Sequence, residues 1–455
     1  MSNGTSKPYL HFIGGNASDV TGSCTIVRFD KIKLAVDCGL VQTNNLIADY
    51  RSNRDLIKRI KPKSIHGVII SHIHADHIGL LLPCAAAGMQ AHIYIPQGSY
   101  NLLKIMLEDS AKIMMQDSLQ MQSKHGVKAP PLATMDDVGK VLDRVIEVPF
   151  NRPTEIVGGA KLTYIPAGHI VNSAQIILDV KQGYVNKRLG FTGDINTEDK
   201  SKSVASIQPL PRCNIIVGEN TYNNPERCYS VKKDRWYDER LITTVIEQYN
   251  KILIPVFSLQ RAEDVLEVLA KIKPDCPIIL DSPLACKIYR SWPEQLDYEE
   301  SLGLKLVSDW NDSLIYQNLN KHMIILASSG MMAAGRVIAY AKHILPNSNN
   351  TILFCGYSSP NTLAYEIKNG SRQVKIDGEW VENNAQIYNL KTFSSHANYN
   401  QLMQYYQEIS YDKLCLVHGD FENKVEFANT LQDKLGKQGK SSRVIAIQQD
   451  TKIYF

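Results

Sequence analysis

Residues 71–77 contain three histidines and one aspartate, and they directly follow Gly67–Ile70, a short apolar run that predicts a buried strand. The four candidate metal ligands are His72, His74, Asp76 and His77. Side chains alternate in direction along an extended chain, so the first three are expected to point one way and the fourth another. One segment could then serve two adjacent cations. Imidazole and carboxylate without a nearby thiolate favour zinc, with manganese or iron as competitors.

Two zinc ions need about seven ligands between them if they share a bridge and keep a position for water. Three more polar residues stand at the ends of apolar, strand-like runs. His169 follows the run at 161–165, and His418 ends the run at 414–417. Asp194 follows a strand through small residues that let a carboxylate approach a cation closely. Together with the first cluster, these residues are expected to complete a two-metal site.

The order of these candidate ligands along the chain resembles that of proteins with the metallo-β-lactamase fold. Val36–Gly39 resembles the first motif of that family. Four further stretches resemble the β-CASP branch, which contains nucleases such as RNase J and the endonuclease of mRNA 3′-end cleavage. They are Gly218–Tyr222, Pro255–Glu263, Ala327–Met332 and Phe393–Ala397. The resemblance implies an α/β protein, an αββα metallo-β-lactamase sandwich with an inserted α/β β-CASP domain.

The resemblance also implies a ligand set for two Zn²⁺ ions per chain, with Mn²⁺ as the alternative. One ion would be held by His72, His74 and His169, the other by Asp76, His77 and His418, and Asp194 would bridge them. Asp37 is expected to orient a ligand histidine through a hydrogen bond. A histidine at position 418 is typical of the RNA-acting members, so RNA is the implied substrate.

Two metal ions that share a water lower its pKa from about 15.7 towards 7, which supplies a hydroxide at neutral pH. Asp76 is expected to accept a hydrogen bond from this nucleophile as well as to bind metal. His396 is the expected general acid for the leaving 3′ oxygen, with Glu219 holding its other nitrogen. Cleavage would leave a 5′-phosphate and a 3′-hydroxyl.

The organisation of the chain follows from its length of 455 residues and its 44% hydrophobic content, which predict two domains. Residues 1–205 are expected to form the first part of the metallo-β-lactamase domain, 206–392 the β-CASP domain, and 393–455 the remainder of the first domain. Within the insertion, the pattern predicts a strand at 252–256 and a helix at 262–272.

Composition restricts where the protein acts. No apolar run of 18 residues exists, and the N-terminus lacks a signal-peptide core, so a cytoplasmic protein without membrane association is expected. The nine cysteines lack CxxC spacing and fit reduced thiols. The formal charge of +4 is only mildly basic, so nucleic-acid binding must come from local patches.

Candidates for binding the RNA lie in the inserted domain. Ser328, Ser329 and Gly330 are expected to form a phosphate-holding loop, because small residues expose backbone amide donors. Arg336 is expected either to add positive charge to this loop or to pair with an acid inside the domain. Thr362 lies in a stretch that resembles the family's Gly-Thr-Leu loop.

A zinc-dependent ribonuclease is the favoured function, and two other classes compete with it. A small-molecule hydrolase of the glyoxalase II or lactonase kind shares the first cluster but lacks the His396 motif and the insertion. A non-catalytic RNA-binding subunit is disfavoured, because every ligand position and the acid are present. DNA cleavage stays open within the first class.

The mode of cleavage is expected to be endonucleolytic. Enzymes like RNase J usually carry a further C-terminal domain, whereas this chain stops soon after its core is complete, and 5′ exonuclease action stays open. A homodimer stays open.

Overall fold

The computed structural model describes residues 7–15, 20–43, 45–183, 185–199, 201–227, 231–292 and 297–455. The chain divides into two compact units. Unit 1 contains Met1–Cys228 and Ser395–Phe455, and unit 2 contains Tyr229–Ser394. Residues 206–228, which the sequence assigns to the insertion, therefore lie in unit 1. The physical reason is β11 (Cys213–Glu219), which pairs with a unit 1 strand on each side.

Two seven-stranded sheets form the centre of unit 1. The first has the order β22 (Lys452–Tyr454), β1 (Tyr9–Phe12), β2 (Thr25–Phe29), β3 (Ile32–Val36), β4 (Gly67–Ile69), β5 (His92–Pro96), β6 (Val145–Val148). The second has the order β21 (Arg443–Ala446), β20 (Tyr411–Val417), β11, β10 (Val185–Phe191), β9 (Ala174–Gln182), β8 (Lys161–Pro166), β7 (Thr154–Glu155). The last strands of the chain thus complete both sheets.

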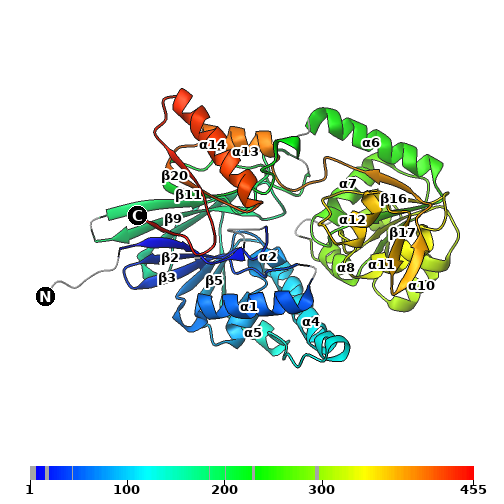
Figure 1. Cartoon of the computed structure of the whole chain (residues 1–455), viewed down its shortest axis with the longest axis horizontal. Coiled ribbons are helices and arrows are strands. Elements are labelled where there is room, and N and C mark those ends of the chain that lie inside the picture. Colours follow the sequence, from blue (N-terminus) through cyan, green and yellow to red (C-terminus); the bar gives the residue numbers. More distant parts are fainter. Residues whose placement is uncertain are drawn as a thin grey trace. The chain divides into compact units, whose positions relative to one another are not determined.

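Helices cover the outer face of each sheet in unit 1 (Figure 1). Beside the first sheet are α1 (Leu46–Ile60), α2 (Ala75–Ile78), α3 (Leu81–Ala86), α4 (Tyr100–His125) and α5 (Asp136–Leu142). Beside the second are α13 (Tyr399–Glu408) and α14 (Phe421–Lys437). Short 3₁₀ turns lie at Pro62–Ser64, Val157–Gly159 and Pro225–Arg227. The order of layers is helix, sheet, sheet, helix, which confirms the expected αββα sandwich.

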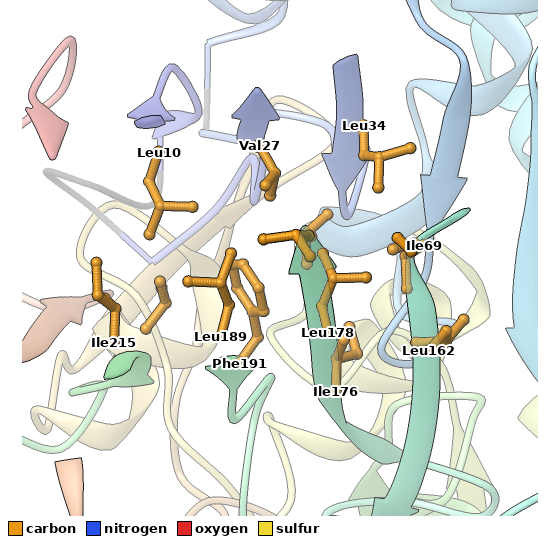
Figure 2. Packing of buried hydrophobic residues seen from close by; sticks show 14 of the residues in the cluster. Leu10, Val27, Leu34, Ile69, Leu162, Ile176, Leu178, Leu189, Phe191 and Ile215 are labelled. Carbon is orange, nitrogen blue, oxygen red and sulfur yellow. The ribbon is translucent and has the colours of Figure 1, made fainter. Parts of the chain in front are cut away.

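The core of unit 1 lies between the two sheets (Figure 2). Side chains alternate along each strand, so every second residue faces the opposite sheet. Leu10, Val27 and Leu34 of the first sheet meet Leu178 and Leu189 of the second in one buried cluster. This buried contact joins the two sheets into one unit.

Unit 2 contains a parallel six-stranded sheet. Its order is β14 (Lys305–Val307), β13 (Ile278–Asp281), β15 (Met323–Ala327), β12 (Lys251–Pro255), β16 (Thr351–Phe354), β19 (Gln386–Asn389). The helices are α6 (Val231–Gln248), α7 (Arg261–Ile272), α8 (Pro283–Arg290), α9 (Tyr298–Ser301), α10 (Trp310–Asn318), α11 (Arg336–Ile344) and α12 (Leu363–Lys368). A hairpin of β17 (Gln373–Ile376) and β18 (Glu379–Glu382) stands apart from the sheet. The inserted α/β domain is confirmed.

Secondary structure departs from expectation at the first ligand cluster. The chain is extended through His74 and then turns into α2, so Asp76 and His77 lie on a helical turn and not on an extended strand. Backbone bonds from His77 and Ile78 to the His74 carbonyl close this turn. Among the described residues, no helix is long and apolar enough to cross a membrane.

Candidate active site

The candidate ligands lie where strands of unit 1 end. His72 follows β4 in the first sheet, and Asp194 follows β10 in the second. Because β8 and β10 both pair antiparallel with β9, they run in the same direction, and β11 and β20 run parallel to β10. His169 and His418 follow β8 and β20, so one edge of the second sheet presents both of them beside Asp194.

A first group of four side chains converges at this edge: His72, His74, His169 and Asp194. The His74 Nδ1 atom lies 3.1 Å from His72 Nε2 and 3.2 Å from His169 Nε2. The Oδ2 atom of Asp194 lies 3.7 Å from the Nε2 atom of both His72 and His169. Three imidazole nitrogens and one carboxylate oxygen thus face one point, an arrangement that suits a cation.

A second group shares Asp194 and adds His77 and His418. The His77 Nε2 atom lies 3.5 Å from Asp194 Oδ2, and His418 Nδ1 lies 3.3 Å from Asp194 Oδ1. Asp76 approaches from the exposed side, with its Oδ2 atom 3.8 Å from His77 Nε2. Asp194 is therefore the one carboxylate that both groups have in common.

Hydrogen bonds fix the ring nitrogens that point away from these groups. His77 Nδ1 lies 2.8 Å from Asp37 Oδ2, and His169 Nδ1 lies 2.8 Å from the Ser395 carbonyl oxygen. Each of these nitrogens donates to its acceptor, which leaves the Nε2 atom of each ring to face the site. Asp37 also accepts a bond from the Ser71 amide at 2.8 Å, which secures its own position.

Burial makes most of these imidazoles neutral. It lowers the pKa of His72 and His169 well below 6.5, the pKa of His418 below 6.5, and the pKa of His74 to about 4. Metal ligands must be neutral imidazoles, so these side chains are ready to bind.

His77 and Asp194 behave differently because carboxylates meet around them. Burial opposes a charge on His77, but Asp194, Asp37 and Asp76 together raise its pKa well above 6.5. Burial also opposes a charge on Asp194, whose pKa nevertheless lies well below its usual value because of His77, His418 and His396. The carboxylates around His77 therefore make the site electrostatically favourable for positive charge.

His396 and Glu219 stand beside the shared carboxylate. The His396 Nδ1 atom lies 3.2 Å from Glu219 Oε2, and its Nε2 atom lies 3.9 Å from Asp194 Oδ2. Glu219 is 1% exposed and accepts a 2.6 Å bond from the Ile195 amide. The ring of Tyr222 meets the His396 ring edge-on, with centroids 5.9 Å apart.

The expected RNA-binding residues all lie in unit 2, in loops after its strands or at helix starts. The Ser328 hydroxyl lies 2.8 Å from that of Ser258, and the Ser329 hydroxyl donates to the Ala334 carbonyl. A Cβ atom on Gly330 would lie 3.1 Å from the Phe257 backbone nitrogen, so the two loops touch there. These contacts bring the loops after β12 and β15 together.

Two other expected RNA-binding residues have partners inside unit 2. Arg336 donates to the buried Asp281 carboxylate and to the Val307 and Ser308 carbonyls. Thr362 caps α12 and donates to the Ser359 carbonyl. Arg336 thus makes the acid pairing that the sequence left as its alternative, and RNA contact by these two side chains stays a prediction.

Sequence reasoning missed two groups that position the ligands. Ser71 donates to Asp37 and lies 3.1 Å from His72 Nδ1, and the backbone of Ser395 fixes His169. The position of Ser71, between a strand and the first candidate ligand, could have indicated its positioning role. The contact from the Ser395 backbone carbonyl could not be predicted, because it does not depend on the type of residue.

Three family models match successive parts of the chain. The metallo-β-lactamase superfamily matches residues 17–211, the Beta-Casp domain matches 260–367, and the Zn-dependent metallo-hydrolase RNA specificity domain matches 380–442.

Curated relatives match most of the chain. It is 28% identical over 436 residues to ribonuclease TTHA0252 of Thermus thermophilus, covering 92% of this chain and 94% of the relative. It is 26% identical over 456 residues to transcription termination factor FttA of Methanocaldococcus jannaschii, covering 94% of this chain and 69% of the relative. It is 28% identical over 400 residues to RNase aCSPSF2 of Saccharolobus solfataricus, covering 85% of this chain and 76% of the relative.

A crystal structure of a protein of unknown function from Enterococcus faecalis aligns with a TM-score of 0.55 at 12% identity, covering 99% of this chain and 100% of the other. That likeness concerns the fold alone. The αββα sandwich and its histidine-rich strand edge define a hydrolase of the metallo-β-lactamase superfamily, whose members bind divalent metal. Within it, the chain belongs to the β-CASP family.

Proposed function

We propose that this protein is a zinc-dependent ribonuclease that hydrolyses phosphodiester bonds within RNA chains. The observation that carries the proposal is Asp194, which joins two ligand groups and lies 3.9 Å from the His396 ring. A site with two cation positions and an adjacent proton donor suits in-line displacement at phosphorus. Relatives named as ribonucleases support RNA as the substrate.

The residues fit two zinc ions, with manganese as the alternative. His72, His74 and His169 would hold one, Asp76, His77 and His418 the other, with Asp194 between them. Two buried atoms support the fit, because neither His77 Nε2 nor Asp194 Oδ1 has a hydrogen-bond partner among the described residues. When bound, such ions would acidify a water and offset the charge that develops on the phosphate.

The residues beside the ligands would move the protons. Asp76 would accept a hydrogen bond from the attacking hydroxide, which has already released its proton to solvent. The hydroxide oxygen forms the new bond to phosphorus as the bond from phosphorus to O3′ breaks. His396 gives the proton on Nε2 to the leaving O3′, while Glu219 balances the charge through Nδ1. The products are a 5′-phosphate and a 3′-hydroxyl.

The loop of Ser328, Ser329 and Gly330 is proposed to hold phosphates of the RNA. It follows β15 at the carboxyl end of a parallel sheet, beside the loop that follows β12. Ligands of open parallel sheets bind at such ends, where neighbouring connections leave in opposite directions.

Cleavage of one internally labelled RNA, in 5′-phosphorylated and 5′-blocked forms, tests the proposal. Both forms should be cut at the same internal positions, and the downstream products should carry 5′-phosphates. Activity that is lost on the blocked form would assign a 5′ exonuclease instead. A single-stranded DNA of the same sequence and a thioester complete the panel, and turnover of the thioester without RNA cleavage would overturn the proposed function.

A further inference from the structure

Helix α6 lies at the surface of unit 2 (Figure 1). It carries two exposed aromatic side chains at consecutive positions. Trp236 is 60% exposed and Tyr237 is 57% exposed. Removing large aromatic side chains from water is favourable, so two exposed ones at consecutive positions of one helix mark a contact site.

The opposite face of α6 is firmly attached to unit 2. Ile242, Val245 and Ile246 belong to a buried cluster of that unit. Asp238 is 1% exposed and accepts hydrogen bonds from the Lys391 amide and from the amide and hydroxyl of Thr392. The two aromatic side chains therefore stand on a fixed support and lose little backbone freedom when they bind.

A cation completes this surface. Arg240 lies one helical turn after Trp236, and its guanidinium carbon is 5.3 Å from the centre of the tryptophan ring. Arg240 is exposed, and no carboxylate among the described residues lies within ion-pair distance of it. The acids nearby are engaged with other cations: Glu239 lies 3.6 Å from Arg235 and 4.0 Å from Lys271.

Other exposed tryptophans of unit 2 lack this combination. Trp380 on β18 is 68% exposed, and no cation lies over its ring in the described part of the chain. Trp310 on α10 has Arg336 over its ring at 5.8 Å, but that guanidinium is paired with Asp281. Among the described tryptophans of unit 2, Trp236 is therefore the one with an arginine over its ring that has no carboxylate partner.

We propose that Trp236, Tyr237 and Arg240 form a binding surface for single-stranded RNA, the substrate class of the proposed ribonuclease, on which this inference rests. Unpaired bases stack on the two rings, and Arg240 reaches the adjacent phosphate. Each base offers an aromatic face, so binding here is tolerant of sequence. Charges of both signs surround the rings, so stacking supplies most of the affinity and salt dependence is modest.

The test is RNA affinity in a His396→Ala background, where the RNA stays intact. A fluorescently labelled single-stranded RNA is titrated by anisotropy against the parent, a Trp236→Ala/Tyr237→Ala variant, and Trp380→Ala as the matched control. The double variant should bind roughly tenfold more weakly, whereas the control should match the parent. Trp236→Phe keeps an aromatic face and should bind nearly as well as the parent.

Arg240→Gln tests the phosphate contact separately. Each contact to a single strand contributes about 0.7 to the slope of log affinity against log salt, so this variant should lose about that much. Affinity that stays at the parental value in the double variant, with circular dichroism showing a folded chain, overturns the inference and leaves the proposed function standing. RNA binding that stays unchanged while self-association is lost in sedimentation assigns the surface to a protein contact instead. If the parent binds no RNA, both proposals fail.

Discussion

The His396 Nδ1 atom lies 3.2 Å from the buried Glu219 Oε2 atom, across 177 positions of sequence. Glu219 ends β11, and His396 lies in the loop that enters α13. Burial alone would lower the pKa of His396, but the Glu219 and Asp194 carboxylates outweigh it and raise the pKa to about 9. The ring is therefore protonated at neutral pH, which a proton donor to a leaving oxygen requires.

His396→Ala is expected to reduce kcat for RNA cleavage by about 10²–10⁴, the usual contribution of general acid catalysis. Both metal ions should stay bound, because His396 belongs neither to the group around His72 nor to the group around His77. Elemental analysis of the purified variant measures this directly. His343→Ala removes an exposed histidine of unit 2 and is the control. Metal loss in His396→Ala would contradict its role as proton donor.

Asp37→Asn is expected to weaken metal binding by about 10–100-fold, the usual effect of removing a carboxylate that orients a ligand histidine. Asp37 has a φ of 58°, a conformation that asparagine tolerates well, so the backbone should be undisturbed. Competition with a zinc-binding dye gives the affinity. Asp30→Asn makes the same change at another positive φ, in the turn between β2 and β3, and should bind metal normally. Equal affinities for the two variants would rule out the orienting role of Asp37.

Substitutions of Asp194 and of His418 should differ in the number of metal ions that the chain loses. Asp194→Asn is expected to deplete both ions, because both groups use that carboxylate, whereas His418→Ala is expected to deplete one. Ions that bind only the folded chain raise its melting temperature, so chelation should lower it and added zinc restore it. The measurements are metal content per chain and thermal melting. Equal metal loss in the two variants would argue against a shared bridging carboxylate.

The sequence could bring the candidate ligands together because they follow apolar, strand-like runs. A run such as 414–417 predicts a buried strand, and the residue after it must stand at a sheet edge, so His418 could be placed without coordinates. The same logic could not say which sheet a strand joins. The run that became β11 was assigned to the insertion, although it pairs with β10 and β20 of unit 1.

Some features of the structure depend on tertiary contacts and could not be predicted from the local sequence pattern. The helical turn at α2 depends on backbone bonds to the His74 carbonyl, which no residue type announces. Ile113 follows the buried Leu102 by about three helical turns, which puts both on the same side of α4, yet Ile113 is 47% exposed. The pairing of Arg336 with Asp281 joins α11 to β13, a neighbour relation that only the fold determines.

Glu263, in the first turn of α7, should make stability fall as pH rises. Its side chain is buried, and burial raises its pKa to about 8 from 4.5. Above pH 4.5 the unfolded chain releases a proton that the folded chain keeps until about pH 8. The free energy of unfolding therefore drops by about 1.4 kcal/mol for each pH unit in this interval.

Glu263→Gln removes that titration. The variant should gain stability over the parent as pH increases from 5 to 8, by on the order of 3 kcal/mol. All four tryptophans of the chain, Trp236, Trp292, Trp310 and Trp380, lie in unit 2, so tryptophan fluorescence in urea reports the unfolding of this unit. Glu247→Gln removes an exposed carboxylate from α6 and should track the parent at both pH values. A stability difference between Glu263→Gln and the parent that is the same at pH 5 and pH 8 would show that Glu263 is ionised in the folded chain throughout.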